Sequence, residues 1–134
     1  MISDQYAAGF FDGEGCINIS SLRGKPFVRI LVVNTNIDIL EKLQQTWGGD
    51  IQKNYKSKSH WKQAYTWRLQ HSACLEFLQD IYPYLVVKKN QAEAAFMFFN
   101  VKPGRGHKWT EESLNEANKV IQIIKNFNKK GIDI

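Results

Sequence analysis

Residues 6–15 read YAAGFFDGEG, and this segment decides how the rest of the chain is interpreted. Glycine inside a helix costs about 0.5–1 kcal/mol relative to alanine, so Gly9 and Gly13 need a reason for their presence. A spacing of four residues places both on one helix face. By analogy with small-residue helix contacts, we expect a second backbone to pack closely there. Glu14 follows at the end of this helix, where a crowded junction that displays one carboxylate suits a metal ion.

Residues 7–15, AAGFFDGEG, resemble the LAGLIDADG motif of homing endonucleases. Gly9, Asp12, Glu14 and Gly15 fall on the first glycine, the first acid, the second acid and the last glycine of that motif. Ala7 replaces its leading leucine, and glutamate replaces aspartate at the second acid. The chain contains one copy, so the resemblance is to the single-motif, homodimeric type.

Length and charge limit the possible classes of protein. A chain of 134 residues forms one domain, here residues 1–134. Its net charge of +5 favours an acidic partner, either nucleic acid or an anionic membrane surface. No apolar run approaches the roughly 20 residues that cross a bilayer, and residues 1–6 lack a basic leader. We therefore expect an intracellular protein without a targeting signal, in a bacterial or phage-infected cytoplasm or an organelle matrix.

Hydrophobic periodicity predicts an α+β fold. Strands are expected from Gly15, over 27–34, and over about 51–57 and 63–70. Helices are expected before, between and after these strand pairs, without the spacing of βαβ units. The expected helix starts are Ser3 or Asp4, Asn36 or Asp38, Ser72, about Asn90, and Thr110. The result is an αββαββα order with an antiparallel sheet and additional C-terminal helices.

Basic residues concentrate in the predicted strands and loops. Segments 23–34 and 51–71 hold eight Lys and Arg and no acid. Because ordinary surfaces intersperse charges, this segregation favours a DNA-binding face over a merely solvated one. In the strand over residues 25–34 both alternating sets of side chains are apolar, so the sequence does not decide which side faces DNA. The predicted DNA-binding residues are Asn18, Ser20, Arg23, Lys25, Arg29, Lys53, Lys56, Lys58, His60, Lys62 and Arg68.

The resemblance implies a mobile, intron-encoded type of endonuclease whose sheet forms a DNA-binding saddle. Two copies pair through their first helices and cut both strands of a long, pseudo-palindromic site. The implied cofactor is Mg²⁺, with Mn²⁺ as a substitute and Ca²⁺ supporting binding without cleavage. The predicted residues are Glu14, Asn34 and Lys88 for catalysis, Glu14 and Gly13 for the metal, and Tyr6, Gly9, Phe10 and Gly13 for the dimer interface.

Other interpretations stay open at this stage. Asp12 is expected to bond backbone rather than metal, and Asn34 could be a turn or cap residue. Lys89 is the alternative to Lys88. The whole chain could be a non-cleaving DNA-binding relative or an intron RNA maturase. A basic α+β RNA-binding module without metal dependence is a further alternative.

Overall fold

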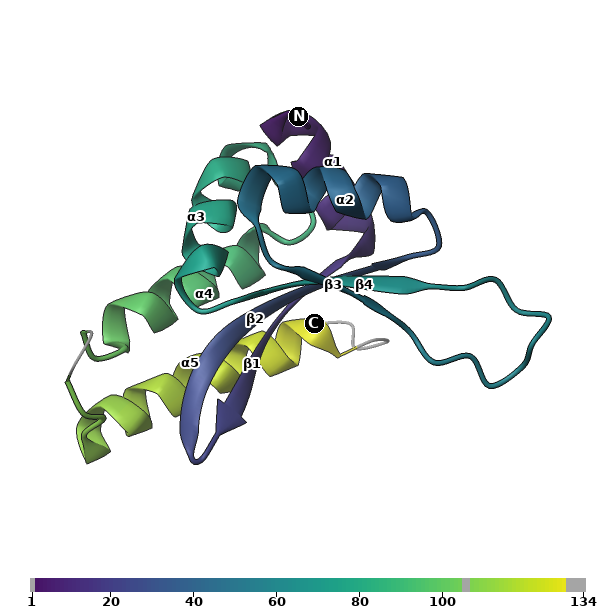
Figure 1. Cartoon of the computed structure of the whole chain (residues 1–134). Helices are drawn as coiled ribbons and strands as arrows, with labels where there is room; N and C mark the ends of the chain where they lie inside the picture. The colour runs from purple at the N-terminus through teal and green to yellow at the C-terminus, as the bar shows by residue number, and fades with distance from the viewer. Residues whose placement is uncertain (1, 105–106, 130–134) are drawn as a thin grey trace.

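The computed structural model describes residues 2–104 and 107–129, and it confirms the predicted α+β fold (Figure 1). In this described part of the chain, five α-helices, a 3₁₀ turn and four strands follow in the predicted αββαββα order, with helices added at the C-terminal end. Their bounds are α1 (Asp4–Glu14), β1 (Gly15–Leu22), β2 (Lys25–Asn34), α2 (Ile37–Trp47), β3 (Asp50–Lys53), β4 (Tyr65–Gln70), α3 (Ser72–Ile81), η1 (Tyr82–Tyr84), α4 (Lys89–Val101) and α5 (Glu111–Asn128).

The four strands form an antiparallel sheet in the order β1-β2-β4-β3. A tight hairpin joins β1 and β2, with Leu22 opposite Lys25. Its two turn residues, Arg23 and Gly24, have φ of 53° and 76°. Positive φ at both positions gives the turn a twist that matches that of the paired strands. Because β4 pairs only with Arg29–Asn34 of β2, the hairpin end of β1 and β2 extends beyond β4.

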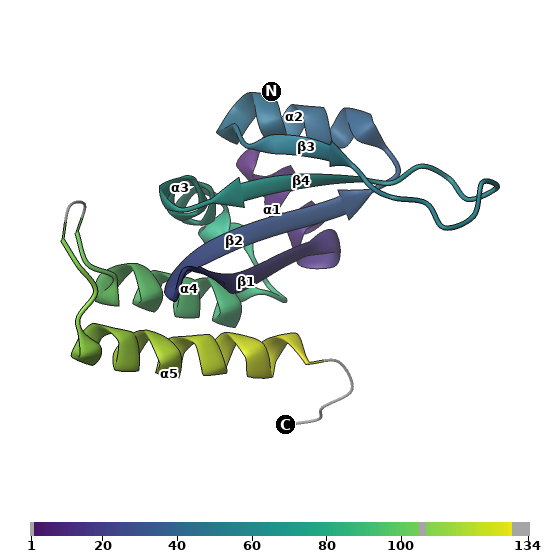
Figure 2. The same ribbon diagram turned by 60° about the horizontal axis from the view of Figure 1, so that its bottom comes forward.

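One face of the sheet forms the core. Val28, Ile30 and Val32 on β2 and Trp67 and Leu69 on β4 are buried. The helices α1, α2 and α3 lie against this face, which Figure 2 shows from the opposite side. Aromatic rings join the layers, because the rings of Phe11, Trp47 and Trp67 all meet Phe77 edge to face.

The alternate strand residues form the other face, which α1, α2 and α3 leave uncovered (Figure 2). In β2 these residues are Lys25, Phe27, Arg29, Leu31 and Val33, and each is exposed or half-buried. The parity that the sequence left open is therefore settled by packing. We call this uncovered side of the sheet the open face.

The C-terminal helices pack on one another beside β1, at the edge of the sheet (Figure 2). Thr110 caps α5 as predicted, and its hydroxyl and that of Ser113 exchange hydrogen bonds with each other's backbone N–H. Asn128 ends α5 with its side-chain amide donating to the carbonyl of Ile17. A polar, basic tail is expected from Asn128 onward, but Asn128 itself is anchored in α5, and residues 130–134 lie outside the described residues.

One predicted strand end and one predicted helix cap are wrong, and β2 and β4 begin at Lys25 and Tyr65 rather than at 27 and 63. The strand expected over 51–57 ends at Lys53, because the chain leaves the sheet and forms a long loop over 54–64. The predicted cap of α3, Ser72, lies inside the helix; the capping position belongs to His71, whose φ is 59°. No helix within the described residues is both long and apolar enough for a membrane span.

Candidate active site and nucleic-acid interface

The junction between α1 and β1 places Glu14 at the end of the sheet. Gly15 has no Cβ, and a Cβ there would clash with the ring of Phe11. Glycine therefore allows the helix to pass directly into the strand while Phe11 stays in the core. The carboxylate that precedes it, on Glu14, is exposed.

Asp12 ties the end of α1 to a distant segment. Its carboxylate accepts hydrogen bonds from the backbone N–H groups of Val86, Val87 and Lys88, at 2.8, 3.1 and 3.0 Å. Three successive N–H groups that converge on one anion fix both the carboxylate and the segment that supplies them. The expectation that Asp12 binds backbone is confirmed.

Lys88 lies beside this carboxylate and is half-buried. Its Nζ donates to the backbone carbonyl of Asp12 at 3.0 Å. A cation at the start of α4 is unfavourable for that helix, but this ammonium reaches the C-terminal carbonyls of α1, where a positive charge is stabilised. Lys89 points elsewhere, with its Nζ 5.2 Å from the ring centre of Tyr82. Of the two candidate lysines, Lys88 is the one held against the end of α1.

Asn34 lies at the same end of the sheet as Glu14, since Gly15 pairs with Val32 and Asn34 follows two residues later. Its side-chain oxygen accepts a 2.8 Å hydrogen bond from the backbone N–H of Asn36. This contact is the turn role that the sequence left open. A role for the Asn34 amide in orienting water stays a prediction.

The end of α1 offers oxygen atoms of the kind that Mg²⁺ takes as ligands, one carboxylate and one backbone carbonyl. Glu14 is free of any ion pair among the described residues, and the carbonyl of Gly13 belongs to the last turn of the helix, which lacks helical donors. Carboxylate and carbonyl oxygens are suitable ligands for Mg²⁺. Within residues 2–104 and 107–129, no group of three or more His, Cys, Asp or Glu could hold a metal ion.

No described segment of the chain covers the two glycines of the predicted dimer face of α1. Gly9 and Gly13 are exposed, and a Cβ at either position would meet nothing within 4 Å. Tyr6 is 59% exposed, and Phe10 is half-buried beside the core. The two glycines therefore serve no close contact within the described part of the chain.

The open face gathers several of the predicted DNA-binding residues. Asn18 on β1 lies opposite Arg29 on β2, which lies opposite Gln70 on β4. The Arg29 guanidinium donates to the Asn18 side-chain oxygen at 3.3 Å. Ser20 and Lys25 follow along the same face towards the hairpin. These polar side chains form a row across three strands, as an interface for phosphates and base edges requires.

Two predicted DNA-binding residues are placed differently. Lys53 lies opposite Tyr65 and on the same side of β3 as Ile51, which is the helix-covered side of the sheet. Arg68 is on the open face, but its guanidinium pairs with Asp50 at 2.8 Å. Asp50 stands one residue before the basic segment 51–71, so the charge pattern of that segment does not reveal it. The open face is therefore not free of acids.

The loop over 54–64 carries most of the remaining basic residues. Its base is fixed, since the Gln63 side-chain amide donates to the carbonyls of Asn54 and Ala64 at 2.6 and 2.8 Å. Beyond that base the loop projects from the sheet (Figures 1 and 2). Two aromatic side chains are exposed on it, Tyr55 at 91% and Trp61 at 49%. The predicted residues on this loop are Lys56, Lys58, His60 and Lys62, and Arg23 is exposed in the hairpin turn.

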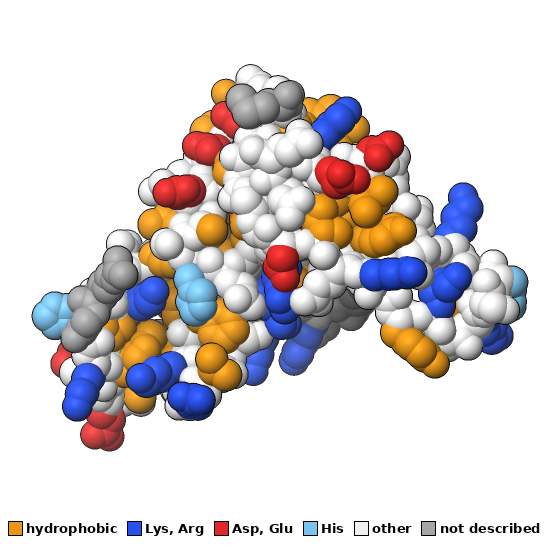
Figure 3. All heavy atoms as spheres, in the orientation of Figure 1, with side chains coloured by type: hydrophobic (Ala, Val, Ile, Leu, Met, Phe, Trp, Pro, Cys, Tyr) orange, Lys and Arg blue, Asp and Glu red, His pale blue; other side chains and the backbone are white. Residues whose placement is uncertain are grey.

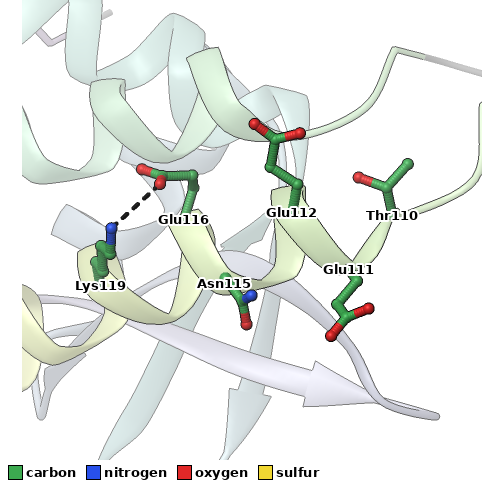
Figure 4. Close-up of a pocket in the computed structure, with 6 residues that line it drawn as sticks. All are labelled: Thr110, Glu111, Glu112, Asn115, Glu116 and Lys119. Carbon is green, nitrogen blue, oxygen red and sulfur yellow. Dashed lines mark hydrogen bonds and ion pairs between the residues drawn. The ribbon is translucent and has the colours of Figure 1, made fainter.

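Charge is divided over the surface. In Figure 3 most acids of the visible side lie over the upper half, where α1, α2 and α3 pack, whereas Lys and Arg gather over the lower half and the projecting loop. A further acidic hollow lies at the start of α5, lined by Glu111, Glu112, Glu116 and Lys119 (Figure 4). There Glu111 points away from the other two acids, and Glu116 pairs with Lys119 at 3.2 Å. This hollow repels a polyanion and offers no converging set of metal ligands.

An open basic sheet face, with an exposed acid and a held lysine at its end, defines a protein suited to act on nucleic acid. The sequence profile described as LAGLIDADG endonuclease matches residues 7–102. The chain belongs to this family. No curated protein sequence matches it.

Solved structures share the fold over nearly the whole chain. The homing endonuclease I-CvuI, in complex with its target in the presence of calcium, has a TM-score of 0.78 at 22% identity, over 98% of this chain and 85% of its own. The archaeal intron-encoded I-Vdi141I, complexed with DNA, has a TM-score of 0.71 at 20% identity, over 96% and 86%. The meganuclease I-AabMI, bound to uncleaved DNA, has a TM-score of 0.71 at 18% identity, over 90% of this chain but 44% of its own.

Proposed function

We propose that this chain is a site-specific, metal-dependent DNA endonuclease that makes a double-strand break as a homodimer. The observation that carries the proposal is the end of α1. The exposed carboxylate of Glu14 lies there, at the end of a basic open sheet face. The ammonium of Lys88 lies at the same helix end and is held there by Asp12. The family to which the chain belongs supports a nuclease.

The proposed chemistry divides between Glu14 and Lys88. Glu14, with the carbonyl of Gly13, would hold Mg²⁺, which activates water and stabilises charge on a scissile phosphate. The ammonium of Lys88 supplies a fixed positive charge beside the same helix end, where it would stabilise the phosphorane-like charge or the leaving oxygen. Asp12 acts as a positioning residue, because it holds the backbone of Lys88 against α1. I-CvuI has been solved with DNA in the presence of calcium and of magnesium, which supports divalent metal use here.

The proposed dimer forms through the bare face of α1. Gly9 and Gly13 have room for a second helix at close range, and Tyr6 and Phe10 flank them with apolar surface. A twofold axis along this face brings two copies of Glu14 together and predicts a near-palindromic target. The match to less than half of I-AabMI supports the pairing of two such units, since a longer chain has room for both.

The proposed DNA contacts follow the open face. Asn18, Ser20 and Arg29 face outward on β1 and β2 and are suited to base edges, whereas lysines of the hairpin and of the loop over 54–64 suit phosphates. Trp61, with Lys58 above its ring at 5.5 Å, adds an exposed aromatic surface to that loop. The sheet and the loop together would follow a long stretch of duplex.

The replacement Glu14→Gln tests the proposed metal site. On a target recovered from a randomised duplex library, cleavage in Mg²⁺ should fall at least about 100-fold, while binding in Ca²⁺ stays close to that of the parent protein. Glu111→Gln is the matched control, because it removes an exposed carboxylate from the start of α5. If Glu14→Gln cleaves as the parent does, the metal assignment is wrong.

The same experiment separates the alternatives. A parent protein that binds DNA sites in both ions without cutting is a non-cleaving relative or a maturase. Preferential binding to RNA, independent of metal and by a single chain, identifies an RNA-binding module instead.

A further inference from the structure

A second basic surface lies at the far end of the open face, outside the predicted DNA-binding residues except for Lys25. Three segments distant in sequence meet there: the start of β2, the junction of β4 with α3, and the connection between α4 and α5. They line a hollow of about 540 Å³. We call it the basic hollow, and its charged and polar lining consists of Lys25, His71, Ser72, Lys102, His107 and Lys108.

The basic hollow has the electrostatics of an anion site. Its described lining includes three lysines and two histidines and no acid. Within residues 2–104 and 107–129, none of the three lysines forms an ion pair with a carboxylate. Lysines crowded together without counterions repel one another, so an anion that enters the hollow relieves that repulsion. The start of α3 also lines it, and no side chain caps that helix.

The walls of the hollow are held in place by packing. The ring of Phe27, on the open face, stacks on His71 at 4.9 Å between ring centres. Trp109, next to Lys108, packs against Phe98 of α4 at 6.1 Å. On the other side of the connection, the backbone N–H of Lys102 closes the last turn of α4. The basic side chains therefore project from fixed backbone, which reduces the entropy lost when they bind.

The position of the hollow indicates which polyanion it binds. Lys25 belongs to the open face, and it is seven residues from Val32, the partner of Gly15. At about 3.4 Å per residue, the hollow lies about 24 Å along β2 from the Glu14 end. The same length of duplex spans about seven nucleotide steps at 3.4 Å each. A duplex whose axis follows β2 outward from the Glu14 end would reach the hollow with its sugar-phosphate backbone.

We propose that the basic hollow binds phosphates of duplex DNA about seven base pairs outward from the cleavage position. This inference rests on the proposed function and extends it to residues of the connection between α4 and α5. Lys102 and Lys108 are the principal ligands, and neither reads sequence. Their contribution is affinity that depends strongly on salt and hardly on the base sequence.

The test is the salt dependence of binding to a fluorescein-labelled 40-base-pair duplex of random sequence. For the double variant Lys102→Gln plus Lys108→Gln, the slope of log affinity against log salt should fall by about 1.8 per bound chain, at about 0.9 per lost phosphate contact. At 0.1 M salt this corresponds to an affinity roughly 60-fold lower. Lys119→Gln is the matched control, since Lys119 is exposed on α5 outside the basic hollow, and it should leave the slope unchanged. Thermal melting of each variant verifies that the fold is intact.

The outcomes separate this inference from the proposed function. A parent protein that binds neither this duplex nor any target selected from a randomised library refutes the proposed function and the inference with it, and a parent that binds only a selected target without a salt-dependent affinity for the random duplex refutes the inference alone. A parent that binds, together with a double variant of unchanged slope, refutes the basic hollow alone. A slope that falls for single-stranded RNA of the same length, but not for the duplex, assigns the hollow to RNA and overturns the inference.

Discussion

The contact between Asp12 and residues 86–88 gives a prediction whose size follows from the structure. The replacement Asp12→Ala removes three hydrogen bonds that join α1 to the segment before α4. Each such bond contributes about 1 kcal/mol net, so the free energy of unfolding should fall by about 3 kcal/mol. With a urea dependence of about 2 kcal/mol per M, the unfolding midpoint moves down by about 1.5 M.

Two further variants make this measurement specific to the contact. Asp12→Asn keeps one acceptor oxygen and should lower the free energy of unfolding by about half as much as Asp12→Ala does. Asp4→Ala removes an acid from the first turn of the same helix, where none of the described contacts uses its side chain, and should cost about 0.3–1 kcal/mol through the helix dipole. All variants are compared at one protein concentration, because dimer formation adds to apparent stability. If Asp12→Ala lowers the free energy of unfolding no more than Asp4→Ala does, the three hydrogen bonds to the backbone do not hold α1 in place.

Three other predictions follow from single residues. Gly9→Leu should raise the dissociation constant of the dimer about 30-fold, which corresponds to about 2 kcal/mol of overpacking. The melting temperature of dilute protein should not fall. An unchanged dissociation constant in sedimentation equilibrium would contradict the proposed interface. Lys88→Ala should reduce the cleavage rate about 100-fold while Lys89→Ala leaves it nearly unchanged, so equal losses in single-turnover assays would refute the assignment of the two lysines. Burial raises the pKa of the Cys74 thiol to about 12, so in native protein at pH 8 it should react with Ellman's reagent far more slowly than half-buried Cys16; one fast phase for both thiols would contradict this burial.

Sequence periodicity and turn chemistry predicted most of the fold. The caps Ser3, Asn36 and Thr110 each accept the expected backbone hydrogen bond, and the turn expected over residues 23–26 narrows to Arg23 and Gly24, because Lys25 and Pro26 already pair in β2. These features depend on neighbouring residues, which a single sequence reveals. The sequence does not show that β3 ends at Lys53, because the polar and basic residues that follow could equally continue a strand.

The candidate site was less accessible from sequence. Asp12 and Lys88 are brought together by tertiary packing across more than seventy residues, and no local pattern encodes that contact. The face of β2 that meets the helices depended on its pairing with β4, because both parities of that strand are apolar. Charge segregation picked out the strands and the loop that carry basic side chains, but it could not tell which side of the sheet each faces and it missed the pairing of Asp50 with Arg68, since both follow from strand register.

The most direct test of the account is cleavage of a randomised DNA library by the purified chain, with Mg²⁺ and Ca²⁺ in parallel. The account predicts double-strand cuts at one family of pseudo-palindromic sites in Mg²⁺, and binding of the same sites without cutting in Ca²⁺. Absence of sequence-selective binding in either ion would contradict it.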